Sequence, residues 1–158
     1  MSRRDQITMS EAEALAFLDE ERTLVCATNG VRGWPHLMPL WYVVRDGTVW
    51  AWTFAKSQKV KNIERDPRVT IQVEAGETYP ELRGVMLECE VRLHHDVEDV
   101  TALGLEIFQR YTPPKDGAAP DALTVDAVRK QASKRVGLEF VEVRRATWDH
   151  RKLAAGVY

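Results

Sequence analysis

The alternation of apolar and polar residues along this chain predicts a protein built mainly of β-strands. Residues 68–74 and 84–93 alternate with a period of two, which is typical of strands with one buried face. Residues 23–28 and 136–143 have the β-branched composition of further strands. With the hairpin described below, the pattern predicts five or six antiparallel strands with helices inserted between them, a barrel of the α+β class.

Helical spacing marks the remaining long segments. Ser10 and Glu13 form a capping-box pattern that begins a helix. Residues 97–111 are amphipathic, and a second helix follows a loop rich in proline and glycine. We expect one domain over residues 1–158, with an N-terminal helix at about 10–20, a helical insertion at about 97–133, and a C-terminal strand and tail at 136–158.

A hairpin is predicted around the turn dipeptide Asp46-Gly47. Counting outward from the turn pairs Val43 with Trp50, Trp41 with Trp52, and Pro39 with Phe54. Both faces of this hairpin are largely apolar, whereas a solvated face should carry polar residues. We therefore expect a core on one side of the hairpin and a subunit or ligand on the other.

The hairpin continues into a short basic helix with the features of a phosphate site. The N-terminus of a helix attracts anions because its first N–H groups are unpaired. The polar residues gathered at this junction are Thr53, Lys56, Ser57, Lys59, Lys61 and Asn62. Ser57 can cap the helix, and Lys59 and Asn62 share one helix face. These residues suit one phosphate group, and the alternative is an ordinary solvated helix face.

The tryptophans beside this junction suggest the other half of a ligand. Trp41 and Trp52 lie on one face of the predicted hairpin and form an aromatic wall. A phosphate site next to such a wall fits a molecule with a planar ring at one end and a phosphate at the other.

Composition narrows the remaining classes of function. The 158 residues carry a formal net charge of −2, which gives no general attraction for nucleic acid. Cys26 and Cys89 stand in apolar stretches, so we expect packed, reduced thiols in a cytoplasmic protein without a membrane segment. His94 and His95 are neighbours on a strand and point to opposite faces, so we expect no metal site.

Several blocks of the chain together resemble the split-barrel proteins related to pyridoxamine 5′-phosphate oxidase, a family that includes flavin and deazaflavin oxidoreductases. The blocks are residues 23–28, 34–42, 56–67, 82–85 and 148–153. The most specific piece is Ser-x-Lys-x-x-Asn at residues 57–62, which leads into Arg-Asp-Pro-Arg.

The resemblance implies a six-stranded antiparallel split β-barrel, mainly β with peripheral helices, that forms a homodimer and holds its cofactor in a groove between subunits. It implies that Thr53, Ser57 and Lys59 hold the cofactor phosphate, with Asn62 and Lys56 or Lys61 completing the site. It places Met38, Pro39 and Trp41 along the cofactor ring, near Trp52, and brings Trp148 and Arg151 from the C-terminal segment of the other subunit.

The expected activity follows from the cofactor rather than from a protein nucleophile. The oxidase of this family has an arginine at about the position of Met38, so the pattern resembles more closely the branch that uses coenzyme F420. We expect a reductase that transfers hydride between F420 and a small unsaturated or quinone-like substrate, with FMN as the alternative cofactor. His36 and Tyr42 are the candidate proton donors.

Two other classes remain open at this point. Some split barrels of the wider group bind haem or tetrapyrroles without catalysis, and His36 is the candidate axial ligand. An oligonucleotide-binding barrel also presents aromatic and lysine side chains on a sheet, although the acidic balance disfavours it.

Overall fold

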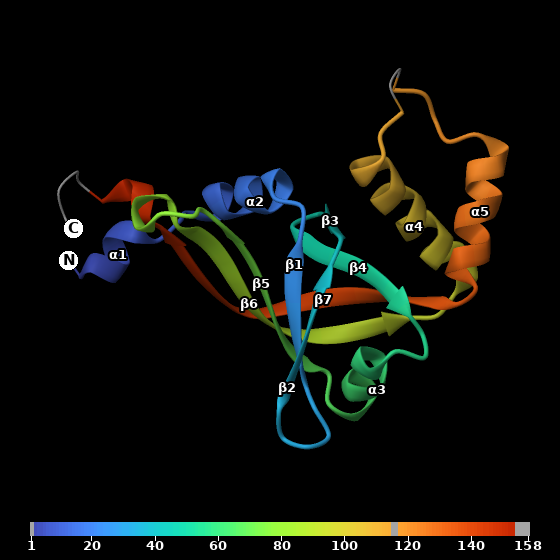
Figure 1. The fold of residues 1–158 in the computed structure, drawn as a ribbon, viewed down its shortest axis with the longest axis horizontal. Helices are drawn as coiled ribbons and strands as arrows, with labels where there is room; N and C mark the ends of the chain where they lie inside the picture. Colours follow the sequence, from blue (N-terminus) through green and yellow to red (C-terminus); the bar gives the residue numbers. More distant parts are fainter. Residues whose placement is uncertain (1, 115–116, 154–158) are drawn as a thin grey trace.

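The structure, a computed structural model, describes residues 2–114 and 117–153. It is organised around one antiparallel sheet of seven strands in the order β2-β1-β5-β6-β7-β4-β3 (Figure 1). The strands are β1 (Leu24–Asn29), β2 (Pro35–Leu40), β3 (Tyr42–Arg45), β4 (Thr48–Phe54), β5 (Arg68–Ala75), β6 (Arg83–His94) and β7 (Arg135–Asp149).

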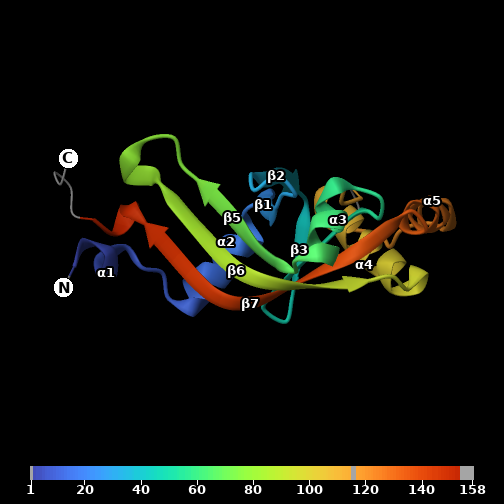
Figure 2. The same ribbon diagram turned by 90° about the horizontal axis from the view of Figure 1, so that it is seen from below.

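Helices lie at both ends of the long strands β6 and β7 (Figure 2). They are α1 (Arg3–Ile7), α2 (Glu11–Glu20), α3 (Gln58–Arg65), α4 (Val97–Tyr111), α5 (Ala122–Ala132) and the 3₁₀ turns η1 (Tyr79–Glu81) and η2 (His150–Lys152). The helices predicted near residues 10–20 and within 97–133 are confirmed as α2, α4 and α5. Lys115 and Asp116 of the expected loop and residues 154–158 of the expected tail lie outside the described residues. Within the described part, no helix is long and apolar enough to cross a bilayer.

The sheet closes on itself because its two edge strands are consecutive in the chain. β2 and β3 stand at opposite edges, and Trp41 alone connects them. The sheet therefore has to curl until its edges meet, which gives the antiparallel split barrel that the sequence predicted. Seven strands are present rather than six, because the predicted first strand of the hairpin divides at Trp41.

This division corrects part of the predicted hairpin register. Val43 does pair with Trp50. The pairs Trp41–Trp52 and Pro39–Phe54 are wrong, because Pro39 pairs with Val25 on β1 and Phe54 pairs with Arg135 on β7. Tyr42, the first residue of β3, lies opposite Ala51. Among the described residues, the end of β4 after Ala51 thus has β7 on one side and no strand on the other.

The two faces of the hairpin enter two separate cores. Tyr42, Val49 and Ala51 are buried in the main core inside the barrel. On the outer face, Val43, Trp50 and Trp52 pack with Leu103 and Ile107 of α4. The face expected to meet a subunit or ligand is thus covered in part by the protein's own helix.

The C-terminal carbonyls of α2 are bound by buried donors from distant elements. The Tyr42 hydroxyl lies 2.6 Å from the carbonyl oxygen of Leu18 and 3.0 Å from that of Glu21. Nη2 of Arg110 donates to the same two carbonyls and to that of Asp19. These contacts satisfy the backbone groups that every helix end leaves unpaired, and they join α2 to β3 and α4.

We predict that Tyr42→Phe lowers the free energy of unfolding by about 1 kcal/mol, because it removes a buried donor and leaves its acceptor carbonyls. Urea denaturation followed by circular dichroism measures this change. Arg110→Met should act in the same direction, and the double variant should lose more than the sum, because only then do the Leu18 and Glu21 carbonyls lose both side-chain donors. Equal stability of Tyr42→Phe and the wild type would contradict this role.

Candidate functional site

The residues predicted to hold a phosphate lie at the end of β4 and the start of α3. Ser57 caps α3, and its Oγ accepts a hydrogen bond from the Val60 N–H at 3.4 Å. Lys59 turns inward: its Nζ donates to Thr53 Oγ1 at 3.1 Å, and the two residues are only 4% and 6% exposed. The structure therefore brings Thr53 and Lys59 into contact and places Ser57 at the start of the helix that carries Lys59.

Lys59 carries a buried charge without a counter-ion. No carboxylate in the described part of the chain forms an ion pair with it, and Thr53 is its one hydrogen-bond partner there. Burial lowers the pKa of Lys59, and burial also raises the pKa of the nearby Cys26 thiol to about 11. A buried ammonium group that has lost its hydration and has no counter-ion would be stabilised by an anionic ligand.

Asn62 has a different role from the one predicted. Its side chain is completely buried, with Nδ2 donating to Thr28 Oγ1 at 3.0 Å and Oδ1 accepting from Gln58 Nε2 at 2.9 Å. The bond to Thr28 joins α3 to β1, so the amide positions the helix that carries Lys59. Lys56 and Lys61 are exposed at the surface.

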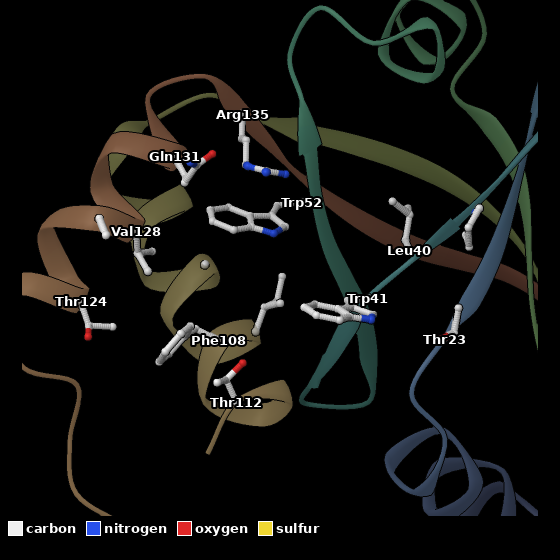
Figure 3. Close-up of a pocket in the computed structure, with 14 residues that line it drawn as sticks. Thr23, Leu40, Trp41, Trp52, Phe108, Thr112, Thr124, Val128, Gln131 and Arg135 are labelled. Atoms are coloured by element: carbon white, nitrogen blue, oxygen red, sulfur yellow. The ribbon is translucent and has the colours of Figure 1, made fainter. Parts of the chain in front are cut away.

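An apolar cavity lies on the opposite face of β4. Its volume is about 850 Å³, and α4 and α5 form its outer wall (Figure 3). The predicted residues Pro39, Trp41 and Trp52 line it. The ring of Trp41 is also stacked on Tyr111, with centroids 4.5 Å apart and planes 8° from parallel. The aromatic wall predicted from the sequence is thus the inner wall of a cavity.

The split in the barrel lies between this cavity and Lys59. Trp52 and Thr53 are consecutive residues on β4, so their side chains point to opposite faces of the sheet. Beyond Ala51 no described strand covers that edge of β4. Lys59 and Trp52 therefore lie on opposite faces of the sheet near this edge.

Three predicted residues lie outside this arrangement. Tyr42 binds α2 carbonyls through a hydroxyl whose pKa is raised by burial, so its contacts are structural. His36 lines a separate recess of about 300 Å³ with Gln58 and Asn62, and its Nδ1 is buried without an acceptor or donor among the described residues. Met38 is 43% exposed on the edge strand β2 and does not line the cavity.

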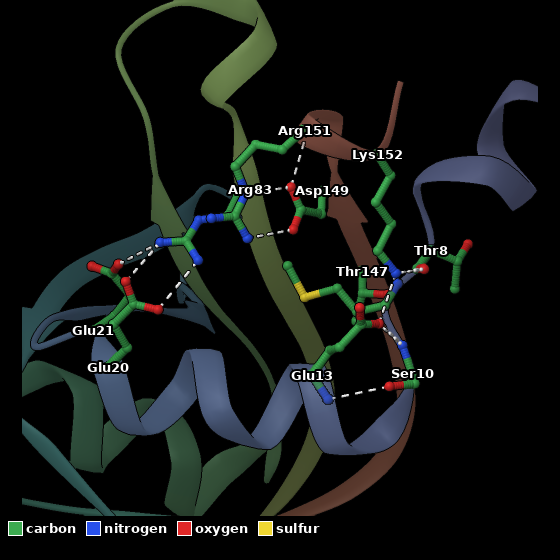
Figure 4. Close-up of polar contacts among 11 residues, drawn as sticks. Thr8, Ser10, Glu13, Glu20, Glu21, Arg83, Thr147, Asp149, Arg151 and Lys152 are labelled. Atoms are coloured by element: carbon green, nitrogen blue, oxygen red, sulfur yellow. Dashed lines mark hydrogen bonds and ion pairs between the residues drawn. The ribbon is translucent and has the colours of Figure 1, made fainter. Parts of the chain in front are cut away.

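Trp148 and Arg151 lie at the far end of β7. Gly137 pairs with Trp52, and Trp148 follows it along β7 after roughly 35 Å of extended strand. There Trp148 packs so closely on Gly84 that a Cβ at Gly84 would lie 2.0 Å from its ring. Arg151 of η2 forms an ion pair at 2.7 Å with Asp149, the last residue of β7 (Figure 4). Within one chain, these two residues do not reach the site.

Arg135 is the residue of the cavity that sequence reasoning missed. It begins β7, lines the cavity beside Gln131 and Trp52, and pairs across the sheet with Phe54 (Figure 3). A basic residue at the start of a strand is common and carries no functional signal of its own. Its significance depends on the partners that the fold gives it.

Comparisons with known proteins were made for the whole chain. The family model for pyridoxamine 5′-phosphate oxidase matches residues 10–145. A solved structure of a conserved hypothetical protein from Mycobacterium tuberculosis is 39% identical, with a TM-score of 0.86 over 99% of this chain and 98% of that one. No curated protein sequence matched.

Two more distant structures share the fold. An F420 reductase is 20% identical, with a TM-score of 0.63 over 83% of this chain and 94% of that one. An FAD-binding protein from Mesorhizobium loti is also 20% identical, with a TM-score of 0.64 over 89% of this chain and 94% of that one.

We predict that Lys59→Met raises the free energy of unfolding of the cofactor-free protein at neutral pH by about 1 kcal/mol, because it replaces an unpaired buried charge with an apolar side chain of similar length. The pH dependence has a definite sign. Between the lowered pKa of Lys59 and the ordinary value of 10.5, the folded state binds fewer protons than the unfolded chain, so wild-type stability rises with pH. Denaturation at pH 7 and pH 10 should show this rise reduced in Lys59→Met; a destabilised variant at pH 7 would show that Lys59 is a structural residue.

Proposed function

The chain belongs to the pyridoxamine 5′-phosphate oxidase family of flavin-binding oxidoreductases, and from that premise we propose that it is an F420-dependent reductase. The activity is hydride transfer between the deazaflavin and a small unsaturated or quinone-like substrate. The observation that supports this proposal most directly is the buried ammonium of Lys59, which has no ion-pair partner among the described residues and lies on the face of β4 opposite the aromatic cavity.

The residues at the junction fit a cofactor phosphate. Lys59 supplies the charge, Thr53 supplies a hydroxyl 3.1 Å from its Nζ, and the eight-residue helix α3 supplies its N-terminus. Asn62 holds α3 against β1 and so fixes the position of Lys59. Together these groups neutralise and orient a phosphate.

The cavity fits the ring end of the same cofactor. Trp41 and Trp52 offer flat apolar surfaces, and the uncovered edge of β4 lets one molecule contact both faces of the sheet. When bound, the cofactor supplies the hydride. The protein orients the ring, and α4 and α5 form the outer wall of the cavity around it. Neither His36 nor Tyr42 lines the cavity, so we assign neither a proton-transfer step.

The choice of F420 over FMN rests on Met38, which stands where the oxidase has arginine. FMN remains the alternative for the same site. The haem alternative has less support from the structure, because its ligand His36 lies in the recess with Gln58 and Asn62 rather than in the large cavity.

A homodimer is part of this proposal. The edge strand β2 and its preceding turn expose Trp34, Leu37 and Met38, which are 76%, 57% and 43% exposed. A second copy covering this strand would also explain how Trp148 and Arg151 come to the site from another subunit.

The cofactor assignment predicts that F420 binds the purified protein and that Lys59→Ala weakens binding by about tenfold or more, since a charge-assisted contact is lost. Titrations followed by cofactor fluorescence, with F420 and FMN in parallel, measure this. Lys61→Ala is the matched control, because it removes an exposed lysine from the same helix. Affinity should also fall as the pH rises through the lowered pKa of Lys59. Unchanged affinity in Lys59→Ala would refute the phosphate site.

The dimer assignment predicts that Leu37→Asp yields folded monomers, because it places a charge in the apolar surface of β2. Light scattering gives the molar mass. Leu123→Asp, on a residue of α5 that is 80% exposed, should leave the dimer intact. A wild-type protein that is monomeric at micromolar concentration would refute the assignment.

A further inference from the structure

We propose that the cavity between β4 and the α4–α5 pair binds a planar organic acid, whose carboxylate forms an ion pair with Arg135. The acid is the acceptor of the hydride, a role that rests on the proposed function, whereas the binding itself does not. In the reduction, the conjugated double bond of the acid gains one hydride from the reduced cofactor and one proton from water, and the cofactor is oxidised by two electrons.

Among the described residues that line the cavity, Arg135 is the only charged one. The other lining residues are neutral, and most of them are apolar or aromatic. A ligand that fills this space therefore needs a flat apolar body and gains from one negative group.

The side chain of Arg135 has no hydrogen-bond acceptor among the described residues. Its guanidinium lies over the rings of Trp52 and Phe54, with the central carbon 4.5 and 4.1 Å from their centroids. The face of an aromatic ring attracts a cation. Its Nε is buried without an acceptor, and no described carboxylate forms an ion pair with it. Burial accordingly lowers the pKa of Arg135.

Arg45 also lies over a tryptophan of β4, but it has a carboxylate partner. It lies over Trp50, two residues before Trp52 on the same face of β4, at 5.0 Å from the ring centroid. There the carboxylate of Glu106 accepts two hydrogen bonds from Arg45, at 2.8 Å to Nε and 2.7 Å to Nη2. Arg135 lies over Trp52, two residues further along β4 and within the cavity, and no described carboxylate pairs with it. A ligand carboxylate bound in the manner of Glu106 supplies that partner.

The test compares two probes of one shape, 2-naphthoate and 2-naphthamide, titrated into cofactor-free protein at low salt and followed by isothermal calorimetry. We expect the acid to bind about tenfold or more tightly than the amide, and Arg135→Gln to abolish that preference while leaving amide affinity unchanged. Unchanged amide affinity also verifies that the variant is folded. Arg135→Lys should retain part of the preference, because it keeps the charge without the planar fork.

Two controls locate the effect. Arg45→Gln removes the other stacked arginine outside the cavity and should leave the preference intact. Ala127→Trp fills the cavity from α5 and should weaken both probes. Equal binding of acid and amide by the wild type, or a preference that survives in Arg135→Gln, would overturn the proposal.

Titration of the Arg135→Gln variant with the cofactor tests whether Arg135 binds the hydride acceptor or the cofactor. Unchanged cofactor affinity supports a substrate site, and a loss of affinity would assign Arg135 to the cofactor and overturn the proposal. If Lys59→Ala leaves cofactor binding unchanged while the acid preference depends on Arg135, the proposed function fails and the binding site stands.

Discussion

A sheet whose two edge strands are consecutive in the chain has to curl until those edges meet, and in this protein they meet at Trp41. Tyr111 of α4 stabilises this corner. Its ring stacks on Trp41, and its hydroxyl lies 3.0 Å from the backbone nitrogen of Tyr42 and 2.9 Å from the backbone carbonyl oxygen of Tyr42. The turn away at Trp41 shortens β3 and leaves the end of β4 uncovered on one edge. The cavity wall, the split in the barrel and the approach to Lys59 all depend on this corner.

Two cations without counter-ions lie on opposite faces of that strand end. Lys59 is buried with Thr53 on the barrel side, and Arg135 lies over Trp52 on the cavity side. Buried charges of this kind reduce stability unless a ligand pairs with them. Other arginines of the protein, such as Arg45 and Arg83, have carboxylate partners. Lys59 and Arg135 are the two cations that we propose pair with anionic ligands.

Much of the fold was predictable because it depends on local pattern. Alternation identified the strands, the capping box identified α2, and the turn Asp46-Gly47 fixed the pairing of Val43 with Trp50. The site was predictable in part for the same reason, since Ser57 and Lys59 belong to one helix start. The prediction failed where a single residue changes the direction of the chain, because alternation continues through Trp41 without any signal that the strand has changed partner.

The sequence by itself therefore determined the elements, their caps and the basic junction, which are set by interactions between residues a few positions apart. The tertiary structure alone decided which charges have partners. Arg45 and Glu106 are 61 positions apart and meet only when α4 packs on β4. Arg135 also lies over aromatic rings, and no carboxylate in the described part of the chain pairs with it, although nothing in its local sequence separates it from Arg45. The physical reason is that these ion pairs join residues far apart in the sequence. They form only when the sheet closes and its helices pack, which local spacing does not encode.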